Sequence, residues 1–276
     1  MSEPSAALKA QSNGAASLEV DDSCKDILNL EIQHLRRAYA DGQLTPPDVI
    51  EGIQDRLKAQ DGDGVWISVV PREEMLKRAR ELEAMDPSDR ERYPLFGLPF
   101  SVKDCIDVAG LPTTAGCPDF AYIPEKTNLA VARALDAGAI LIGKTNTSEL
   151  AIGSHTVNKI FGPTANPYNH SLSAGGSSGG AAAAVSMNLV PCSDGSDMMG
   201  SCRNPAAFTN LYGYRPSPGV IPELRENSVV KKMPILSTTG VIARIPKDLC
   251  YYMDCIAGKD EKDERSADIN YSFLEI

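Results

Sequence analysis

The fold of this chain is decided by the stretch Gly175-Gly-Ser-Ser-Gly-Gly180 and, after an alanine run, Asp194-Gly-Ser-Asp-Met-Met-Gly-Ser-Cys-Arg-Asn-Pro205. Both segments are glycine-rich turns that carry serines. Backbone N–H groups at the ends of buried segments are free to bind an anion. The two turns are therefore predicted to place two hydroxyls at adjacent ends of buried secondary structure. Their chemistry depends on which group activates the serines.

Short apolar runs, separated by turn-forming residues, precede and follow these turns. An apolar run bounded by Gly or Pro is typical of a buried strand, and apolar residues spaced by three and four are typical of a helix. Strands and helices alternate, which predicts an α/β protein whose β-sheet core is covered by helices on both faces. The expected strands are residues 65–70, 95–102 and 140–142, and the expected helices are residues 71–84, 128–137, 179–187 and a last helix ending at Gly258.

The chain is expected to form a disordered tail and a single domain. The tail is rich in Ser, Ala, Glu and Gly and has almost no large apolar residue. A helical hairpin follows, with apolar spacing from Ile27 to Leu35 in its first helix and a start signal at Thr45-Pro46-Pro47 in its second. The expected boundaries are residues 1–22 for the tail, 23–276 for the domain, 25–60 for the hairpin and 95–258 for the catalytic core.

Composition restricts the partners of the chain. A net charge of −10 and a pI of about 4.9 give no electrostatic attraction to nucleic acid or to an acidic membrane, so a small molecule is the expected partner. The seven cysteines are odd in number and lack CxxC pairs, which favours reduced thiols over disulfides or a zinc site. No apolar run approaches the roughly 18 residues that span a bilayer. We therefore expect a soluble, cytoplasmic protein.

Two motif matches are rejected by their context. Gly138-Ala-Ile-Leu-Ile-Gly-Lys-Thr145 fits the phosphate-loop pattern, but Ala-Ile-Leu-Ile is typical of a buried strand rather than a loop that wraps phosphate. We expect a strand ending at Gly143 with Lys144 at its exposed tip, and nucleotide binding is kept only as a third hypothesis. The segment Gly176–Gly180 fits the nucleophile elbow G-x-S-x-G of α/β-hydrolases. All three histidines precede Ser178, whereas that fold places its histidine after the serine.

A lysine can activate a serine without any histidine. Burial disfavours the ammonium form, and a neutral lysine can then act as a general base. Lys103 fits this role because it follows the apolar run 95–102 and is expected at the inner end of a strand. The alternative reading is a structural lysine at a strand end, paired with Asp104.

The combination of Lys103 with the two serine-bearing turns resembles the amidase signature family, and the similarity runs from about Leu30 to Gly258. Ser201 follows Ser177 by 24 residues, and Ser177 follows Lys103 by 74, close to the family pattern. The resemblance implies a mixed β-sheet core and a Ser–Ser–Lys triad that hydrolyses amide bonds. By position, Ser201 is then the nucleophile, Ser177 the bridging serine in a cis peptide, and Lys103 the general base.

The resemblance also implies the surroundings of the triad. It assigns an oxyanion hole to backbone N–H groups and a supporting ion pair to the residues that bracket the nucleophile. We interpret that pair as rigidifying the turn rather than acting in the chemistry. No metal and no organic cofactor are implied. The oxyanion donors are Met198, Met199, Gly200 and Ser201, and the supporting residues are Asp197, Arg203 and Ser178.

Within the family, the N-terminal half is most similar to allophanate hydrolase, in residues 35–46 and 107–122 especially. The catalytic half departs from the family at Met198-Met199, where many members have Thr-Gly or Thr-Ala before Gly-Ser. We expect a small-molecule amide as substrate, with allophanate as a sub-hypothesis. Family members usually continue beyond the helix ending at Gly258, so we expect a fold that is incomplete at the C-terminus. Either a homodimer or another partner covers the open sheet, or the chain is a truncated product that folds poorly. The alternative function is a truncated, catalytically impaired amidase-like protein or a non-catalytic binding subunit.

Overall fold

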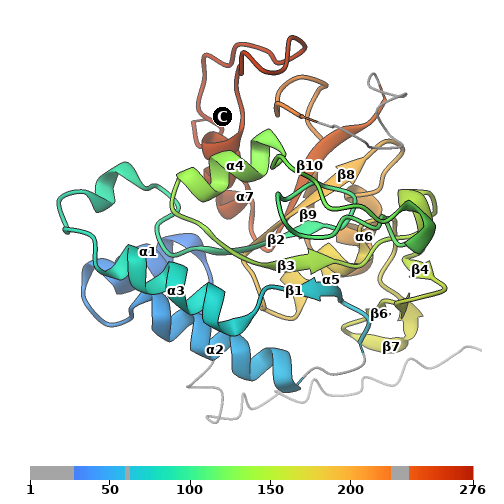
Figure 1. Ribbon diagram of the computed structural model, residues 1–276, viewed down its shortest axis with the longest axis horizontal. Coiled ribbons are helices and arrows are strands. Elements are labelled where there is room, and N and C mark those ends of the chain that lie inside the picture. The colour runs from blue at the N-terminus through green and yellow to red at the C-terminus, as the bar shows by residue number, and fades with distance from the viewer. Residues whose placement is uncertain (1–27, 60–62, 225–235, 276) are drawn as a thin grey trace, which may run out of the picture.

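The computed structural model describes residues 28–59, 63–224 and 236–275 (Figure 1). The tail expected over residues 1–22 lies outside the described residues, as does the beginning of the expected hairpin.

A six-stranded mixed sheet forms the centre of the molecule, in the order β1-β3-β2-β8-β10-β9. The strands β2 and β3 are parallel, as are β2 and β8, whereas the other neighbouring pairs are antiparallel. Every residue of β2, β3, β8 and β10 is buried, as expected for strands covered on both faces. The strands are β1 Trp66–Val69, β2 Pro99–Lys103, β3 Ile140–Thr145, β8 Cys192–Asp197, β9 Tyr212–Tyr214 and β10 Thr238–Ala243.

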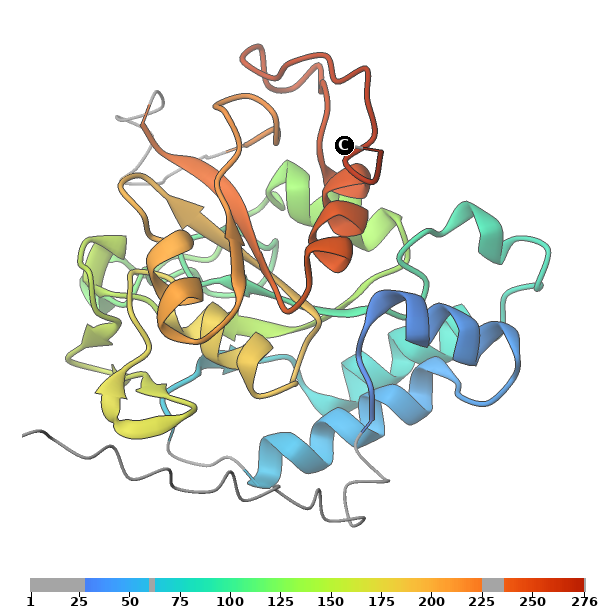
Figure 2. The ribbon, with the colours of Figure 1, turned by 180° about the vertical axis from the view of Figure 1, so that it is seen from behind.

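Helices cover both faces of this sheet, as predicted (Figures 1 and 2). One face carries α4 and α7, which pack on each other, and the opposite face carries α5. The helices α2 and α3 pack together beside β3 and β1. The helices are α1 Ile32–Ala40, α2 Pro46–Ala59, α3 Arg72–Glu83, α4 Leu129–Asp136, α5 Gly179–Ser186, α6 Arg203–Phe208 and α7 Pro246–Ile256.

Two short hairpins lie outside the main sheet, before the first serine-bearing turn. They replace what the sequence suggested to be plain turns around residues 166–171. Their strands are β4 Val157–Asn158 with β5 Gly162–Pro163, and β6 Ala165–Asn166 with β7 Asn169–Ser173.

Helix α5 approaches the sheet closely because it is built from glycine and alanine. Its four alanines are fully buried. A Cβ atom at Gly180 would lie 2.4 Å from the backbone nitrogen of Asn146 and 2.6 Å from the carbonyl oxygen of Val65. Real Cβ atoms do not approach backbone so closely, so the start of α5 tolerates no side chain at this position. The prediction of a small-residue helix packed against the sheet is confirmed.

Local sequence signals located the second helix of the hairpin correctly. The Thr45 hydroxyl accepts from the Asp48 N–H at 3.3 Å, and the Asp48 carboxylate accepts from the Thr45 N–H at 2.8 Å. This reciprocal pair satisfies N–H groups at the helix start. The first helix was misplaced, since it begins at Ile32 rather than near Ile27. There the Ile32 N–H donates to Asp248 and the Leu28 carbonyl accepts from Arg56, so distant groups hold this segment out of a helix.

Two further strand predictions were wrong in detail. The strand expected over 95–102 begins only at Pro99, because residues 95–98 form a turn in which the Leu98 N–H donates to the Leu95 carbonyl. The strand expected to end at Gly143 continues to Thr145. Lys144 is therefore fully buried rather than exposed at a tip.

Candidate active site

Lys103 ends the central strand β2 and meets two hydroxyls. Its side chain is fully buried, and Nζ donates to Ser177 Oγ at 2.6 Å and to Ser196 Oγ at 2.9 Å. Ser196 comes from the parallel neighbour β8, and Ser177 comes from the turn before α5. The fold thus brings the lysine and the first turn together across 74 residues of sequence.

The first turn is fixed by hydrogen bonds that other segments make to its backbone groups. The Gly176–Ser177 peptide bond is cis, as the resemblance implied. The Ser177 carbonyl accepts from the Ser148 N–H and from the Thr156 hydroxyl, both at 3.3 Å. The Gly176 N–H donates to Asn204 Oδ1 at 3.1 Å. These contacts hold the Ser177 hydroxyl against Lys103.

The second turn is tied to the first through Ser178. The Ser178 N–H donates to the Ser201 carbonyl at 3.1 Å, and the Ser178 hydroxyl donates to the Ser196 carbonyl at 3.4 Å. Ser201 is partly exposed. Within the described part of the chain, its hydroxyl has no hydrogen-bond partner. Ser201 therefore sits beside the Lys103–Ser177 pair with a hydroxyl accessible to solvent.

Asp197 organises the loop around Ser201. Its buried carboxylate accepts from the N–H groups of Gly200 at 2.7 Å and Cys202 at 3.1 Å. The Arg203 guanidinium donates to the same carboxylate at 3.0 and 2.9 Å, a two-pronged ion pair. Burial raises the pKa of Asp197, but the hydrogen bonds from Arg203, Gly200 and Cys202 outweigh it and lower the pKa to about 2. This geometry fits the interpretation of the pair as a brace for the turn.

Backbone donors are available next to Ser201. The N–H groups of Met198, Met199 and Ser201 have no acceptor among the described residues, whereas that of Gly200 is donated to Asp197. Gly200 adopts a φ of +120°, which disfavours any side chain at this point. The Met199 side chain is 81% exposed and lies on the surface of the turn. Three of the four expected oxyanion donors are thus unengaged, and the fourth is occupied.

Lys144, the lysine of the rejected phosphate-loop match, lies in a different setting. Nζ donates to Thr113 Oγ1 at 2.6 Å and to the Pro112 carbonyl at 2.9 Å, and it lies 3.4 Å from Asp104 Oδ1. Burial lowers the pKa of Lys144, although the carboxylates of Asp104 and Asp107 act in the opposite direction. The segment that fits the phosphate-loop pattern contributes strand β3, and the Lys144 ammonium group is enclosed by protein acceptors. These residues therefore form no loop that could wrap a phosphate.

Two residues of the site were missed from the sequence. Ser196 is the second hydroxyl on Lys103, and Cys105 Sγ lies 3.5 Å from Ser196 Oγ as a free thiol. A signal for Ser196 was present, because it is the first serine of the Gly-Ser-x-x-x-Gly-Ser pattern that carries the resemblance. Cys105 had none, since it looked like one of several scattered thiols.

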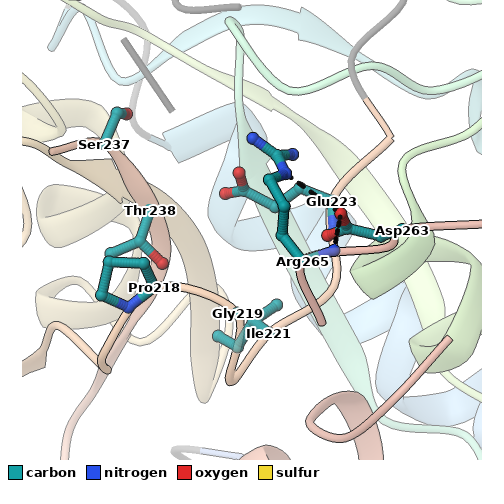
Figure 3. A pocket seen from close by; sticks show the side chains of 8 residues that line it. All are labelled: Pro218, Gly219, Ile221, Glu223, Ser237, Thr238, Asp263 and Arg265. Carbon is teal, nitrogen blue, oxygen red and sulfur yellow. Dashed lines mark hydrogen bonds and ion pairs between the residues drawn. The ribbon is translucent and has the colours of Figure 1, made fainter. Parts of the chain in front are cut away.

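A cavity of about 240 Å³ lies at the beginning of β10 (Figure 3). Ser237 and Thr238 lie on one side of it, and Glu223, Asp263 and Arg265 on the other. The Asp263 carboxylate holds the latter side together by accepting from the Glu223 N–H at 2.9 Å and from Arg265 Nε at 3.1 Å. The lysine and serines described above are not part of its described lining, so this cavity is separate from them.

In residues 28–59, 63–224 and 236–275, no three His, Cys, Asp or Glu side chains are arranged to hold a metal ion. Over the same ranges, no helix has both the length and the apolar character needed to cross a membrane.

A mixed α/β sheet that carries a buried Lys–Ser pair beside a second serine-bearing turn is the arrangement that the resemblance to the amidase signature class implied. The family model described as Amidase matches residues 48–275. The chain therefore belongs to the amidase family.

Relatives and solved structures of this family are similar to the chain over most of its length. A glutamyl-tRNA(Gln) amidotransferase subunit of Thermus thermophilus is 38% identical over 243 residues, covering 87% of this chain and 49% of the relative. The urea amidolyase of Saccharomyces cerevisiae is 40% identical over 172 residues, 62% of this chain and 9% of the relative. The structure of Kluyveromyces lactis allophanate hydrolase matches with a TM-score of 0.76 at 33% identity, covering 88% of this chain and 39% of that one. The chain spans about half the length of the amidotransferase subunits that it matches.

Proposed function

We propose that this chain hydrolyses the C–N bond of a small-molecule carboxamide through a Ser–Ser–Lys triad. Ser201 is the nucleophile, Ser177 the bridging serine and Lys103 the general base. The observation that supports the proposal most directly is the 2.6 Å hydrogen bond between Lys103 Nζ and Ser177 Oγ in a fully buried environment. A short contact of this kind is the geometry that proton transfer requires.

The reaction follows from this order of groups. In its neutral form Lys103 donates to Ser196 and turns its lone pair to the Ser177 hydroxyl, whose proton it accepts while Ser177 accepts that of Ser201. The Ser201 oxygen then attacks the carbonyl carbon of the amide, and the C–O double-bond electrons move to oxygen. When the C–N bond breaks, the proton returns along the same path to the leaving nitrogen. Water attacks the acyl-enzyme by the same route and releases the carboxylic acid.

The developing negative charge needs donors aimed at it. We assign these to the backbone N–H groups of Met198, Met199 and Ser201, which have no acceptor in the described residues. The Gly200 N–H joins them only if it leaves Asp197, to which it donates at 2.7 Å. One such donor stabilises the transition state by roughly 3 kcal/mol in other enzymes.

For the substrate, we propose allophanate or a related linear amide. The likeness to allophanate hydrolase and to urea amidolyase supports this choice. The bulky Met198 and Met199, where many family members carry smaller residues, support an amide with an apolar face as the alternative. We also propose a cytoplasmic protein that acts in a homodimer or with another partner, which the naming of several relatives as subunits supports.

A second candidate function is a non-catalytic or impaired subunit. It is favoured by the Ser201 hydroxyl, which makes no hydrogen bond to Ser177 within the described residues. The naming of several relatives as subunits is also compatible with a non-catalytic role.

A fluorophosphonate probe separates the two candidates, because it reacts only with an activated serine. We expect covalent labelling of the wild type at Ser201, measured by mass spectrometry, and loss of labelling in Ser201→Ala. Ser171→Ala is the matched control, since this exposed serine lies on β7 and should label as the wild type does. Folded wild type that stays unlabelled would contradict the catalytic proposal and support the second candidate.

A further inference from the structure

A second cavity lies at the opposite end of β2 from Lys103. It has a volume of about 540 Å³ and is enclosed by the C-terminal end of α1, the turn at Gly42 and the segment 87–96. In Figure 1 this is the side of the molecule where α1 faces the loop that follows α3. A hollow of about 140 Å³ adjoins it and shares Tyr39, Gly42, Arg90 and Phe96. We call the two together the α1 cavity, whose size is that of a small-molecule site.

The walls of the α1 cavity are aromatic and firmly held. The rings of Tyr39 and Phe96 meet edge to face, with centroids 5.8 Å apart. The Tyr39 hydroxyl donates to the Gly97 carbonyl at 3.0 Å. Gly97 has a φ of +66°, and a Cβ there would lie 3.0 Å from the Tyr39 ring, so the turn presses directly against this wall. Tyr93 adds a third ring to the lining. The cavity is therefore preformed for a flat apolar group.

Arg90 gives this apolar cavity a fixed donor. Its guanidinium lies over the Phe96 ring at 5.1 Å, and Nη2 donates to the Glu83 carbonyl at 2.9 Å. The Nε atom is sealed by surrounding protein, so a molecule in the cavity cannot reach it. Nη1 is neither buried nor hydrogen-bonded among the described residues, and its N–H groups can donate to a bound acceptor.

The remaining charges around the cavity favour an anion. Arg36 is the other cation of the larger cavity, held by a 3.1 Å hydrogen bond from Nη1 to the Pro94 carbonyl and by the Tyr251 ring at 4.9 Å. Glu91 is the one acid in the described lining of the larger cavity, and Glu83 lines the adjoining hollow. Both arginines line the larger cavity with Glu91 alone, whereas Glu83 balances the charge from the adjoining hollow, so the larger cavity is the part that attracts an anion.

We propose that the α1 cavity binds a small monocarboxylate with a flat, apolar body. The body lies against the Tyr39, Tyr93 and Phe96 rings, and the carboxylate accepts from Nη1 of Arg90, with Arg36 adding attraction. This site is distinct from the serines and lysine of the proposed catalytic centre. Binding at this site does not depend on the proposed amide hydrolysis.

A titration with 3-phenylpropionate tests the proposal, with 3-phenylpropanol as the uncharged analogue, followed by calorimetry and ligand-observed NMR. We expect saturable binding of the acid and weaker binding of the alcohol. Arg90→Met should weaken binding of the acid by about tenfold or more, because a hydrogen bond to a charged group is lost. Arg92→Met is the matched control, since Arg92 is exposed, lies two residues away and does not line the cavity. It should bind as the wild type does.

Two further variants keep the test decisive. Ala40→Trp places a ring in the cavity from an exposed position on α1, so it should abolish binding without removing any contact of the fold. Ser201→Ala should leave binding unchanged, which separates this site from product binding at the serines. Circular dichroism checks that each variant is folded. The proposal is overturned by no saturable binding to the wild type, by equal binding of the alcohol, or by folded Arg90→Met and Ala40→Trp variants that bind normally.

Discussion

Two lysines lie on neighbouring strands of the central sheet, and both are fully buried. Lys103 on β2 meets the hydroxyls of Ser177 and Ser196. Lys144 lies on β3 and is paired with Val102 of β2 in the parallel register. Its side chain faces Asp104 and Thr113 instead. One lysine is thus held by groups that can pass protons, and the other is held beside a carboxylate.

The difference shows that burial does not by itself identify a base. Both side chains have lost their water, yet the Lys144 ammonium lies against the Asp104 carboxylate, which stabilises its charge. Asp104 also accepts from the N–H and the hydroxyl of Thr114, so this pair anchors the loop that leaves β2. We infer that Lys144 holds the loop in place while Lys103 works at the serines. The following predictions test that division.

The largest expected effect is on activity at Lys103. Lys103→Ala should lower amide turnover and fluorophosphonate labelling by roughly 10²–10⁴-fold, because the proton acceptor is removed. The free energy of unfolding, measured in urea, should change far less than the activity does. A folded Lys103→Ala variant with near wild-type turnover would refute the role of this lysine as the base.

The next effect is on stability at Lys144. Lys144→Met should lower the free energy of unfolding by about 3–5 kcal/mol, because the Asp104 carboxylate loses its partner while it remains buried. Adding Asp104→Asn should restore part of this loss, which urea unfolding of both variants would measure. At temperatures where Lys144→Met is folded, Ser201 should still be labelled. A variant as stable as the wild type but unlabelled would reverse the roles of the two lysines.

The smallest expected effect is on the pH dependence of stability, and it concerns Asp197, the carboxylate that organises the loop around Ser201. The pKa of Asp197 is about 2 in the folded chain and about 4 when unfolded, so the stability that it adds is present above pH 4. This stability is lost as the pH falls from about 4 to about 2, and the loss amounts to roughly 2 kcal/mol once solvent screening at the half-exposed Arg203 is allowed for. Asp197→Asn should lack this part of the pH dependence in urea unfolding. Arg203→Met should move it to higher pH, whereas an unchanged profile in both variants would show that the pair is not formed in solution.

Much of the site could be predicted because its signals are local. Glycine-rich turns with serines can be recognised in the sequence, and Lys103 follows an apolar run that marks the end of a strand. The helix starting near Thr45 and the small-residue helix α5 were located for the same reason, since capping residues and alanine runs act over a few positions.

The errors concern residues whose partners are far away in the sequence. Lys144 was expected in solvent because its acceptors at Asp104 and Thr113 lie 30 to 40 residues earlier. The α1 cavity was missed for the same reason, because α1 and the segment around Arg90 meet only in the fold. Periodicity and turn signals contain no information on such contacts.

Because position 180 has no room for a side chain, the amino-acid sequence cannot change at this glycine without moving the backbone. Its neighbours at the position of a Cβ atom are backbone atoms of Asn146 and Val65, which cannot rotate out of the way. Helix α5 begins only two residues after Ser177, so any added atom would be accommodated by moving the helix start and the serine with it. A misplacement of about 1 Å costs reactions of this kind on the order of 100-fold. The distance between Lys103 and Ser177 is therefore preserved only while position 180 remains a glycine, although Gly180 belongs to neither of these residues.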